Sequence, residues 1–143
     1  MSKPKLHIFI PGLTQRDYEY RRGDSVLVYD DLGNAILIDG GEWELFVVML
    51  AFMKAHGIKH ICYILTHWHG DHDCGLKYVL EDPYIIVDEI YAPNPEELKL
   101  VSKDSGYDEY KRAVRRINQA KELKKKIVYP TPGKRVGHWV GKI

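Results

Sequence analysis

One short segment limits the folds open to this chain more than any other feature of its sequence. Residues 61–65 (ICYIL) form an apolar run that ends at Thr66. The next six positions hold four side chains of types that bind metals: His67, His69, Asp71 and His72. Because alternate residues of a strand face opposite sides, these side chains can converge only if the backbone turns, and Gly70 supplies the freedom to turn. The pattern predicts a loop at the carboxyl end of a buried strand, where open α/β sheets bind their ligands.

The residue types in this loop favour a particular group of metals. Imidazole nitrogens and carboxylate oxygens suit Zn²⁺, and also Fe or Mn²⁺. His67 and His69 can supply two ligands to one ion, and Asp71 and His72 can supply two to a second. Two ions about 3.5–4 Å apart can polarise a carbonyl or phosphoryl oxygen and hold a hydroxide between them. The alternative is a solvated loop rich in histidine, but four residues of metal-binding type in so short a segment favour the metal site.

The same segment resembles a known family signature. Residues 67–72 (HWHGDH) resemble the HxHxDH motif of the metallo-β-lactamase superfamily. Upstream, residues 23–28 (GDSVLV) and 36–41 (ILIDGG) resemble the opening of that fold, and residues 57–67 resemble its competence-protein (ComEC-like) branch. The resemblance implies an α/β fold, the metallo-β-lactamase-type αββα sandwich, in which a mixed sheet is flanked by helices.

The resemblance also implies a ligand set and an activity. In the family, the first two histidines bind one zinc and the Asp-His pair binds the other, which assigns His67 and His69 to the first site and Asp71 and His72 to the second. The implied activity is that of a metal-dependent hydrolase, in which a metal-activated water attacks a phosphodiester, ester or amide. Asp71 would also orient the nucleophile or accept its proton. The competence-protein branch suggests a nucleic acid or another phosphodiester as substrate.

The length of the chain raises an alternative. Complete domains of this family have a second half that supplies further ligands, so residues 1–143 are expected to form a single domain, the N-terminal half, truncated at the C-terminus. Lys134 stands where some members carry their third histidine, which leaves His138 as the remaining candidate ligand in the chain. The alternative function is a non-catalytic or incomplete half-domain that binds metal weakly or self-associates as a homodimer.

Charge and composition exclude some other classes of protein. A net charge of +1 argues against strong non-specific attraction to nucleic acid. The two cysteines, Cys62 and Cys74, form no disulfide framework, and Cys74 is expected to be a packing residue rather than a ligand. The longest apolar run, residues 45–53, is too short to cross a bilayer. A cytoplasmic protein without a membrane segment is therefore expected.

The rest of the chain predicts alternating strands and helices. Expected strands cover residues 6–10, 25–29, 35–38, 61–65, 84–91 and 127–129, and expected helices cover 43–56, 75–80 and a segment from about 107 to 123. The helix over 43–56 is apolar nearly all round, which predicts burial on more than one side. His7 is expected to point to solvent from its strand, and His56 and His60 to be capping or surface residues.

Three features carry two interpretations each. Asp39 is either a turn and capping residue or a carboxylate that steadies a ligand histidine. Residues 13–22, rich in Tyr and Arg, are either part of a nucleic-acid groove or a connecting loop. The basic residues of the last helix, led by Lys111, Arg112, Arg115 and Arg116, either face a phosphate or form the solvated side of an amphipathic helix, which is the favoured interpretation.

Overall fold

The computed structural model describes residues 3–9, 23–100 and 106–133. The elements in these ranges are β1 (Lys5–Phe9), β2 (Ser25–Tyr29), β3 (Asn34–Ile38), α1 (Trp43–Ala55), β4 (His60–Ile64), α2 (Gly70–Glu81), β5 (Ile86–Tyr91), the 3₁₀ helix η1 (Pro95–Leu100), α3 (Gly106–Glu122) and β6 (Lys126–Val128). The predictions for residues 13–22, Lys134 and His138 lie outside the described residues.

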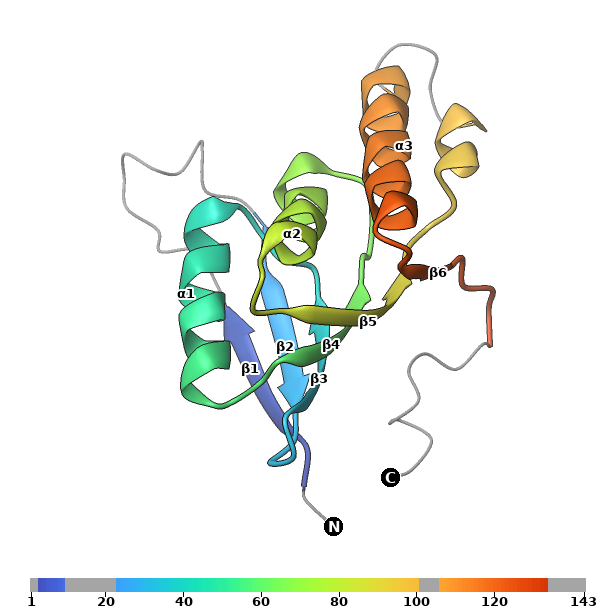
Figure 1. Cartoon of the computed structure of the whole chain (residues 1–143). Helices are drawn as coiled ribbons and strands as arrows, with labels where there is room; N and C mark the ends of the chain where they lie inside the picture. Colours follow the sequence, from blue (N-terminus) through green and yellow to red (C-terminus); the bar gives the residue numbers. More distant parts are fainter. Residues whose placement is uncertain (1–2, 10–22, 101–105, 134–143) are drawn as a thin grey trace.

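The described strands form one mixed sheet in chain order, β1-β2-β3-β4-β5-β6 (Figure 1). β1, β2 and β3 pair antiparallel, while β3 to β6 run parallel and are connected by helices. The hairpin between β2 and β3 turns at Asp30, whose carboxylate accepts hydrogen bonds from the backbone N–H groups of Leu32 and Asn34. This architecture confirms the predicted α/β class, a mixed sheet with flanking helices.

One face of the sheet holds the core. Leu27, Leu37 and Tyr63 are fully buried there against Met49 and Met53 of α1. α2 and α3 add side chains to the same cluster, so the described helices cover one face. None of the described helices is long and apolar enough to span a membrane.

The opposite face carries side chains that the described helices do not cover. Alternation along β1 places Leu6 and Ile8 there, and these side chains are 63% and 53% exposed. His7 points the other way, with its ring 4.3 Å from the ring of Phe52 on α1. The expectation that His7 faces solvent is therefore wrong, because its neighbours in the strand occupy the open face.

Two helices differ from their predicted form. α1 is buried along one side only, and Trp43, Val47 and Val48 are 55%, 44% and 58% exposed. The expectation of burial on more than one side is wrong, because in the described residues the sheet contacts only one side of α1. α2 begins at Gly70, five residues before the predicted start at Gly75.

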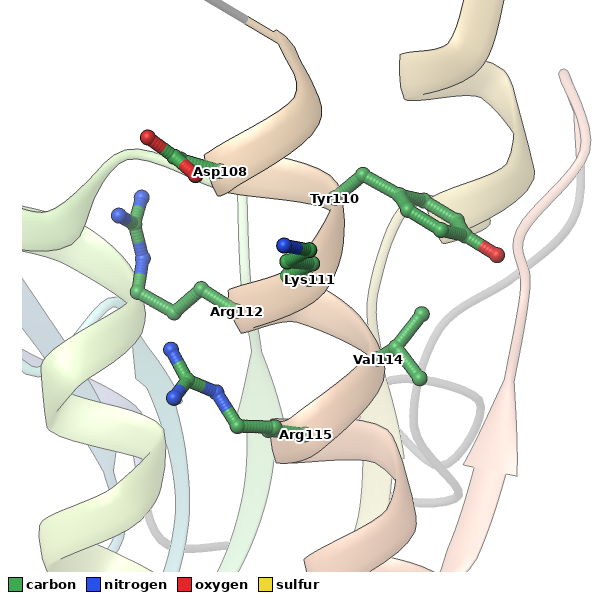
Figure 2. Close-up of a pocket in the computed structure, with 6 residues that line it drawn as sticks. All are labelled: Asp108, Tyr110, Lys111, Arg112, Val114 and Arg115. Carbon is green, nitrogen blue, oxygen red and sulfur yellow. The ribbon is translucent and has the colours of Figure 1, made fainter.

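The basic side chains of α3 differ in exposure. Lys111 and Arg115 are exposed beside an open pocket of about 400 Å³, which is lined by Asp108, Tyr110, Lys111, Arg112, Val114 and Arg115 (Figure 2). Arg112 instead reaches α2, where its Nε donates a hydrogen bond to Asp73. The predicted basic side of the helix therefore has both a solvated part and a part that binds the neighbouring helix.

Candidate metal centre

The loop between β4 and α2 is fixed to the sheet on both sides of its first histidine. The backbone N–H of Leu65 donates to the carbonyl of Tyr91, 2.8 Å away. Trp68 is 3% exposed, and its indole Nε1 donates to the carbonyl of Pro93 at 2.9 Å. Because Trp68 points into the core, the flanking His67 and His69 point away from it, and their ring centroids lie 4.6 Å apart.

Asp71 and His72 lie in the first turn of α2, not in the loop. The carbonyl of His69 accepts from the backbone N–H groups of His72 and Asp73 at 2.9 and 2.8 Å, which starts the helix. Gly70 is its first residue and does not have a positive φ. The expectation that Gly70 turns the chain is wrong: extended backbone at His69 makes the turn, and acidic residues stabilise the N-terminal end of the helix dipole.

Asp39 connects this loop to the end of β3. β3 pairs parallel with β4, so the carboxyl ends of both strands meet and Asp39 reaches the residues after Ile64. Its Oδ1 accepts from the backbone N–H of Thr66 at 2.9 Å, while its Oδ2 accepts from the Thr66 hydroxyl at 2.6 Å and from His72 Nδ1 at 2.8 Å. Of its two interpretations, the structure supports the carboxylate that steadies a histidine.

These hydrogen bonds define which nitrogen of each histidine is free. In its neutral form, His72 donates from Nδ1 to the Asp39 carboxylate, which leaves the lone pair on Nε2. Thr66 has one hydroxyl proton, which it gives to Asp39, so its oxygen accepts from His67 Nδ1 at 2.8 Å. One carboxylate thus sets the tautomer of His72 directly and that of His67 through Thr66, and leaves both Nε2 atoms available as metal ligands.

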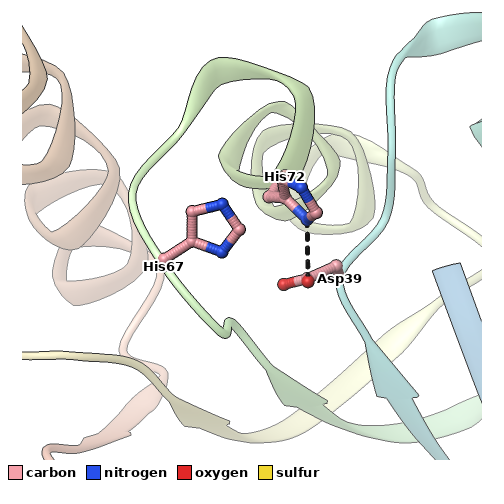
Figure 3. Close-up of side chains that lie close together, drawn as sticks. All are labelled: Asp39, His67 and His72. Carbon is pink, nitrogen blue, oxygen red and sulfur yellow. Dashed lines mark hydrogen bonds and ion pairs between the residues drawn. The ribbon is translucent and has the colours of Figure 1, made fainter. Parts of the chain in front are cut away.

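Three potential ligand side chains lie close together (Figure 3). Asp39, His67 and His72 each offer a ligand atom, and these atoms lie within 4.8 Å of one another. The rings of His67 and His72 are 4.1 Å apart, and Asp71 Oδ2 lies 3.8 Å from His72 Nε2. Two imidazoles beside a carboxylate form a donor set that suits Zn²⁺.

His69 faces a different partner. Its Nε2 lies 3.4 Å from Oε1 of Glu109 on α3, and it is not a member of the compact group. The structure therefore brings together His67 and His72, places Asp71 beside them, and leaves His69 turned toward α3. No feature of the sequence indicates that Glu109 contacts His69, because Glu109 lies 40 positions away in an ordinary helical segment.

The protein environment favours the neutral form of one candidate ligand, His67. Burial, and then the nearby His72 and His69, lower the pKa of His67 below its ordinary value. A lowered pKa favours the neutral imidazole at neutral pH, which is the form that binds a metal. The electrostatics of the site and the donor set therefore agree.

The other candidate ligands lie in separate environments. Burial, together with Glu89 and Asp88, raises the pKa of the Cys62 thiol to about 12, and burial also raises that of Cys74. Neither thiol forms a disulfide. His56 caps the end of α1 and His60 lies 3.2 Å from Asp88, in agreement with their predicted roles.

Comparison with known proteins identifies a family and similar proteins. The family model described as the metallo-beta-lactamase superfamily matches residues 19–138. The lactamase-like protein nscB of Arthroderma gypseum is 35% identical over 46 residues, which are 32% of this chain and 15% of that protein. The crystal structure of the DIM-1 metallo-beta-lactamase aligns with a TM-score of 0.47 and 17% identity, over 99% of this chain and 57% of the other. The chain therefore spans only part of the length of both relatives.

Proposed function

Because the chain belongs to the metallo-beta-lactamase superfamily, we propose that it is a metal-dependent hydrolase whose centre is built from the loop after β4 and the first turn of α2. One observation carries the proposal: a single buried carboxylate, Asp39, contacts Nδ1 of His72 directly and Nδ1 of His67 through Thr66, an arrangement that leaves both Nε2 atoms free in the neutral histidines. Carboxylate-histidine pairs of this kind orient ligands in metal sites.

Each residue of the motif has a proposed role. His67, His69, Asp71 and His72 would hold one or two Zn²⁺ ions, with Mn²⁺ or Fe as alternatives, and His69 would exchange Glu109 for the metal. A bound zinc ion supplies a coordinated water of lowered pKa and polarises the substrate. Asp71, 3.8 Å from His72, would orient that water or accept its proton. Asp39 orients the histidines without contacting substrate.

The proposed substrate is a phosphodiester, in a small molecule or in a nucleic acid. Support comes from the sequence resemblance of residues 57–67 to the competence-protein branch and from the exposed Lys111 and Arg115 on α3. The near-zero net charge makes the nucleic acid the weaker of the two. An ester or amide substrate would use the same chemistry.

A second candidate is a half-domain that binds metal without efficient catalysis. The observation that favours it is the open sheet face, where Leu6 and Ile8 are exposed and no described helix lies over them. Such a face could pair with a second copy of the chain. This homodimer and the cytoplasmic location remain predictions.

Metal content tests the proposal first. Protein purified without a chelator is expected to hold stoichiometric zinc, which a His67→Ala/His69→Ala double variant loses. The matched control is a His56→Ala/His60→Ala double variant, because these histidines lie outside the centre and should leave the zinc content unchanged. Equal zinc in the wild type and the His67/His69 variant would contradict metal binding at this loop.

Turnover of bis-p-nitrophenyl phosphate separates the two candidates. We expect weak turnover that Asp71→Ala reduces by about 10²-fold or more, the range for removal of an acid-base group. Zinc binding without any turnover would favour the half-domain. Turnover that survives Asp71→Ala would contradict the role of Asp71.

A further inference from the structure

Arg112 of α3 makes two hydrogen bonds beside the candidate metal centre, one to the first turn of α2 and one to the loop before it. Its Nε donates to Asp73 Oδ2 at 2.6 Å, and its Nη2 donates to the backbone carbonyl of Trp68 at 2.9 Å. Asp73 is fully buried, and the Arg112 side chain is 25% exposed. The guanidinium therefore lies in the contact between α2 and α3, with only part of the side chain exposed to solvent.

The two acceptors lie on either side of the proposed ligands. Trp68 directly precedes His69, and Asp73 directly follows His72. The indole of Trp68 is already fixed in the core, so its carbonyl is a rigid attachment point. By binding both, Arg112 fixes the loop relative to the first turn of α2, and this relative placement decides whether the ligands converge.

The chemistry of this contact requires a guanidinium. Its donors point in fixed directions in one plane, so one side chain can serve a carboxylate and a carbonyl at once, whereas the single ammonium of lysine cannot match both directions. Asp73 also neutralises the positive charge that Arg112 would otherwise place beside a bound cation. In the described part of the chain, Asp73 Oδ1 has no hydrogen-bond partner, which makes Arg112 the main partner of this buried carboxylate.

We propose that Arg112 is a positioning residue of the metal centre, which holds the segment from Trp68 to Asp73 in the shape that binds the ion. The proposal rests on the proposed function, since it concerns the affinity of the same site. It assigns to α3 a role in metal binding although Arg112 itself touches no ligand atom.

The first test measures zinc affinity by competition with a chromophoric chelator. Arg112→Met keeps the length of the side chain but removes its donors, and we expect zinc binding to weaken about 10- to 100-fold, as for other groups that orient ligands. Arg112→Lys should lie between this variant and the wild type. Arg115→Met, a matched loss of charge at an exposed position of the same helix, should leave the affinity unchanged.

A second variant separates positioning from general stability. Arg112→Met leaves the Asp73 charge buried without a partner, which destabilises the fold by itself. In an Arg112→Met/Asp73→Leu double variant the ion pair becomes an apolar contact, so the melting temperature of the metal-free protein should recover. Zinc affinity should stay weak, because the Trp68 carbonyl still lacks its donor, and the Co²⁺ absorption spectrum should differ from that of the wild type.

The outcomes distinguish this proposal from the proposed function. If the wild type binds zinc and the double variant binds it equally well with an unchanged Co²⁺ spectrum, Arg112 has only a structural role and the positioning proposal is wrong. If the wild type itself binds no zinc, the proposed function fails, and the positioning role fails with it.

Discussion

At the scale of single residues, Asp39 shows how much of the site depends on one side chain. Its φ of 53° is in the left-handed region, which non-glycine residues rarely adopt, and it is 5% exposed. Such strained positions persist where the surrounding structure requires them, often at functional sites. Here the requirement is visible, because the strained backbone directs the carboxylate to both Thr66 and His72.

The Thr66 hydroxyl offers a direct test of this arrangement. Thr66→Val keeps the shape of the side chain but removes the link between Asp39 and His67, so His67 should lose its fixed tautomer while His72 keeps its own. The measurement is ¹H–¹⁵N NMR of the imidazole nitrogens in metal-free protein. We also expect roughly 10-fold weaker zinc binding, the lower end of the range for residues that orient ligands.

Thr66→Ser is the matched control, since it retains the hydroxyl and should preserve both tautomers and the zinc affinity. If His67 keeps the same tautomer in Thr66→Val, the proton arrangement described for the wild type is incorrect.

Which residues of the site could be predicted depends on their distance along the chain. His67 and His72 belong to one contiguous motif, so their types and spacing were visible in the sequence. The role of Asp39 was ambiguous in the sequence, because an aspartate before two glycines is also typical of a turn. Arg112 lies 44 residues from Trp68, and its position on the basic side of a helix indicated solvent as readily as a buried contact.

At the scale of secondary structure elements, a contact between two glycines determines how closely α2 approaches β3. A Cβ atom on Gly40 would lie 2.5 Å from Cα of Gly75, and one on Gly75 would lie closer still to Cα of Gly40. Asp39 precedes the first glycine, and His72 lies three residues before the second, on the same side of α2. The hydrogen bond between Asp39 and His72 therefore depends on this close approach.

Gly75→Ala should separate the two backbones. Because neither backbone can yield easily, we expect a loss of about 1–3 kcal/mol or more in the free energy of unfolding, measured by urea denaturation. The control on the same helix is Gly70→Ala, where the nearest atom to a new Cβ is 3.9 Å away and alanine is the better helix former. Equal stability of the two variants would contradict the close contact.

The errors in predicting these elements have a local cause. The predicted helix began at Gly75 because the histidine motif was interpreted wholly as a loop, although two acidic residues, Asp71 and Asp73, are a signal typical of a first helical turn. The length of α1 was predicted well, since Gly57, with a φ of 65°, follows its C-cap residue His56. The burial of α1 was not predicted well, because composition alone does not show how many sides of a helix pack against other elements.

At the scale of the whole molecule, the fold class was predicted from the resemblance of residues 23–28, 36–41 and 67–72 to a family signature. The alternation of predicted strands and helices is typical of the same α/β class. The arrangement of layers could not be predicted in this way. The residue pattern of a strand shows that both of its faces are apolar, but it does not show which element covers each face. In the described residues, helices cover the face that includes Leu27 and Tyr63, while Leu6 and Ile8 lie on the other. Pairing of that face with a second copy remains a prediction.

Zinc should stabilise the whole fold, because its proposed ligands are held in place only in the folded chain. Asp39 and Thr66 orient His67 and His72 through hydrogen bonds between separate segments, so the unfolded chain offers no comparable site. At a free zinc concentration about 100 times the Kd, the expected gain is about 2.7 kcal/mol, or roughly 5–11 °C in melting temperature for a chain of this size. The measurement is a thermal melt after removal of metal with a chelator and again after addition of zinc.

Two comparisons make the melting experiment specific. Mg²⁺ should give no comparable shift, because it prefers oxygen ligands in octahedral geometry and two of the three converging groups are imidazoles. His72→Ala removes one converging imidazole, so its melting temperature should no longer respond to zinc, whereas His60→Ala, which changes a histidine beside Asp88, should respond like the wild type. A zinc response that persists unchanged in His72→Ala would mean that the ion binds elsewhere and that the convergence of these side chains does not create the site.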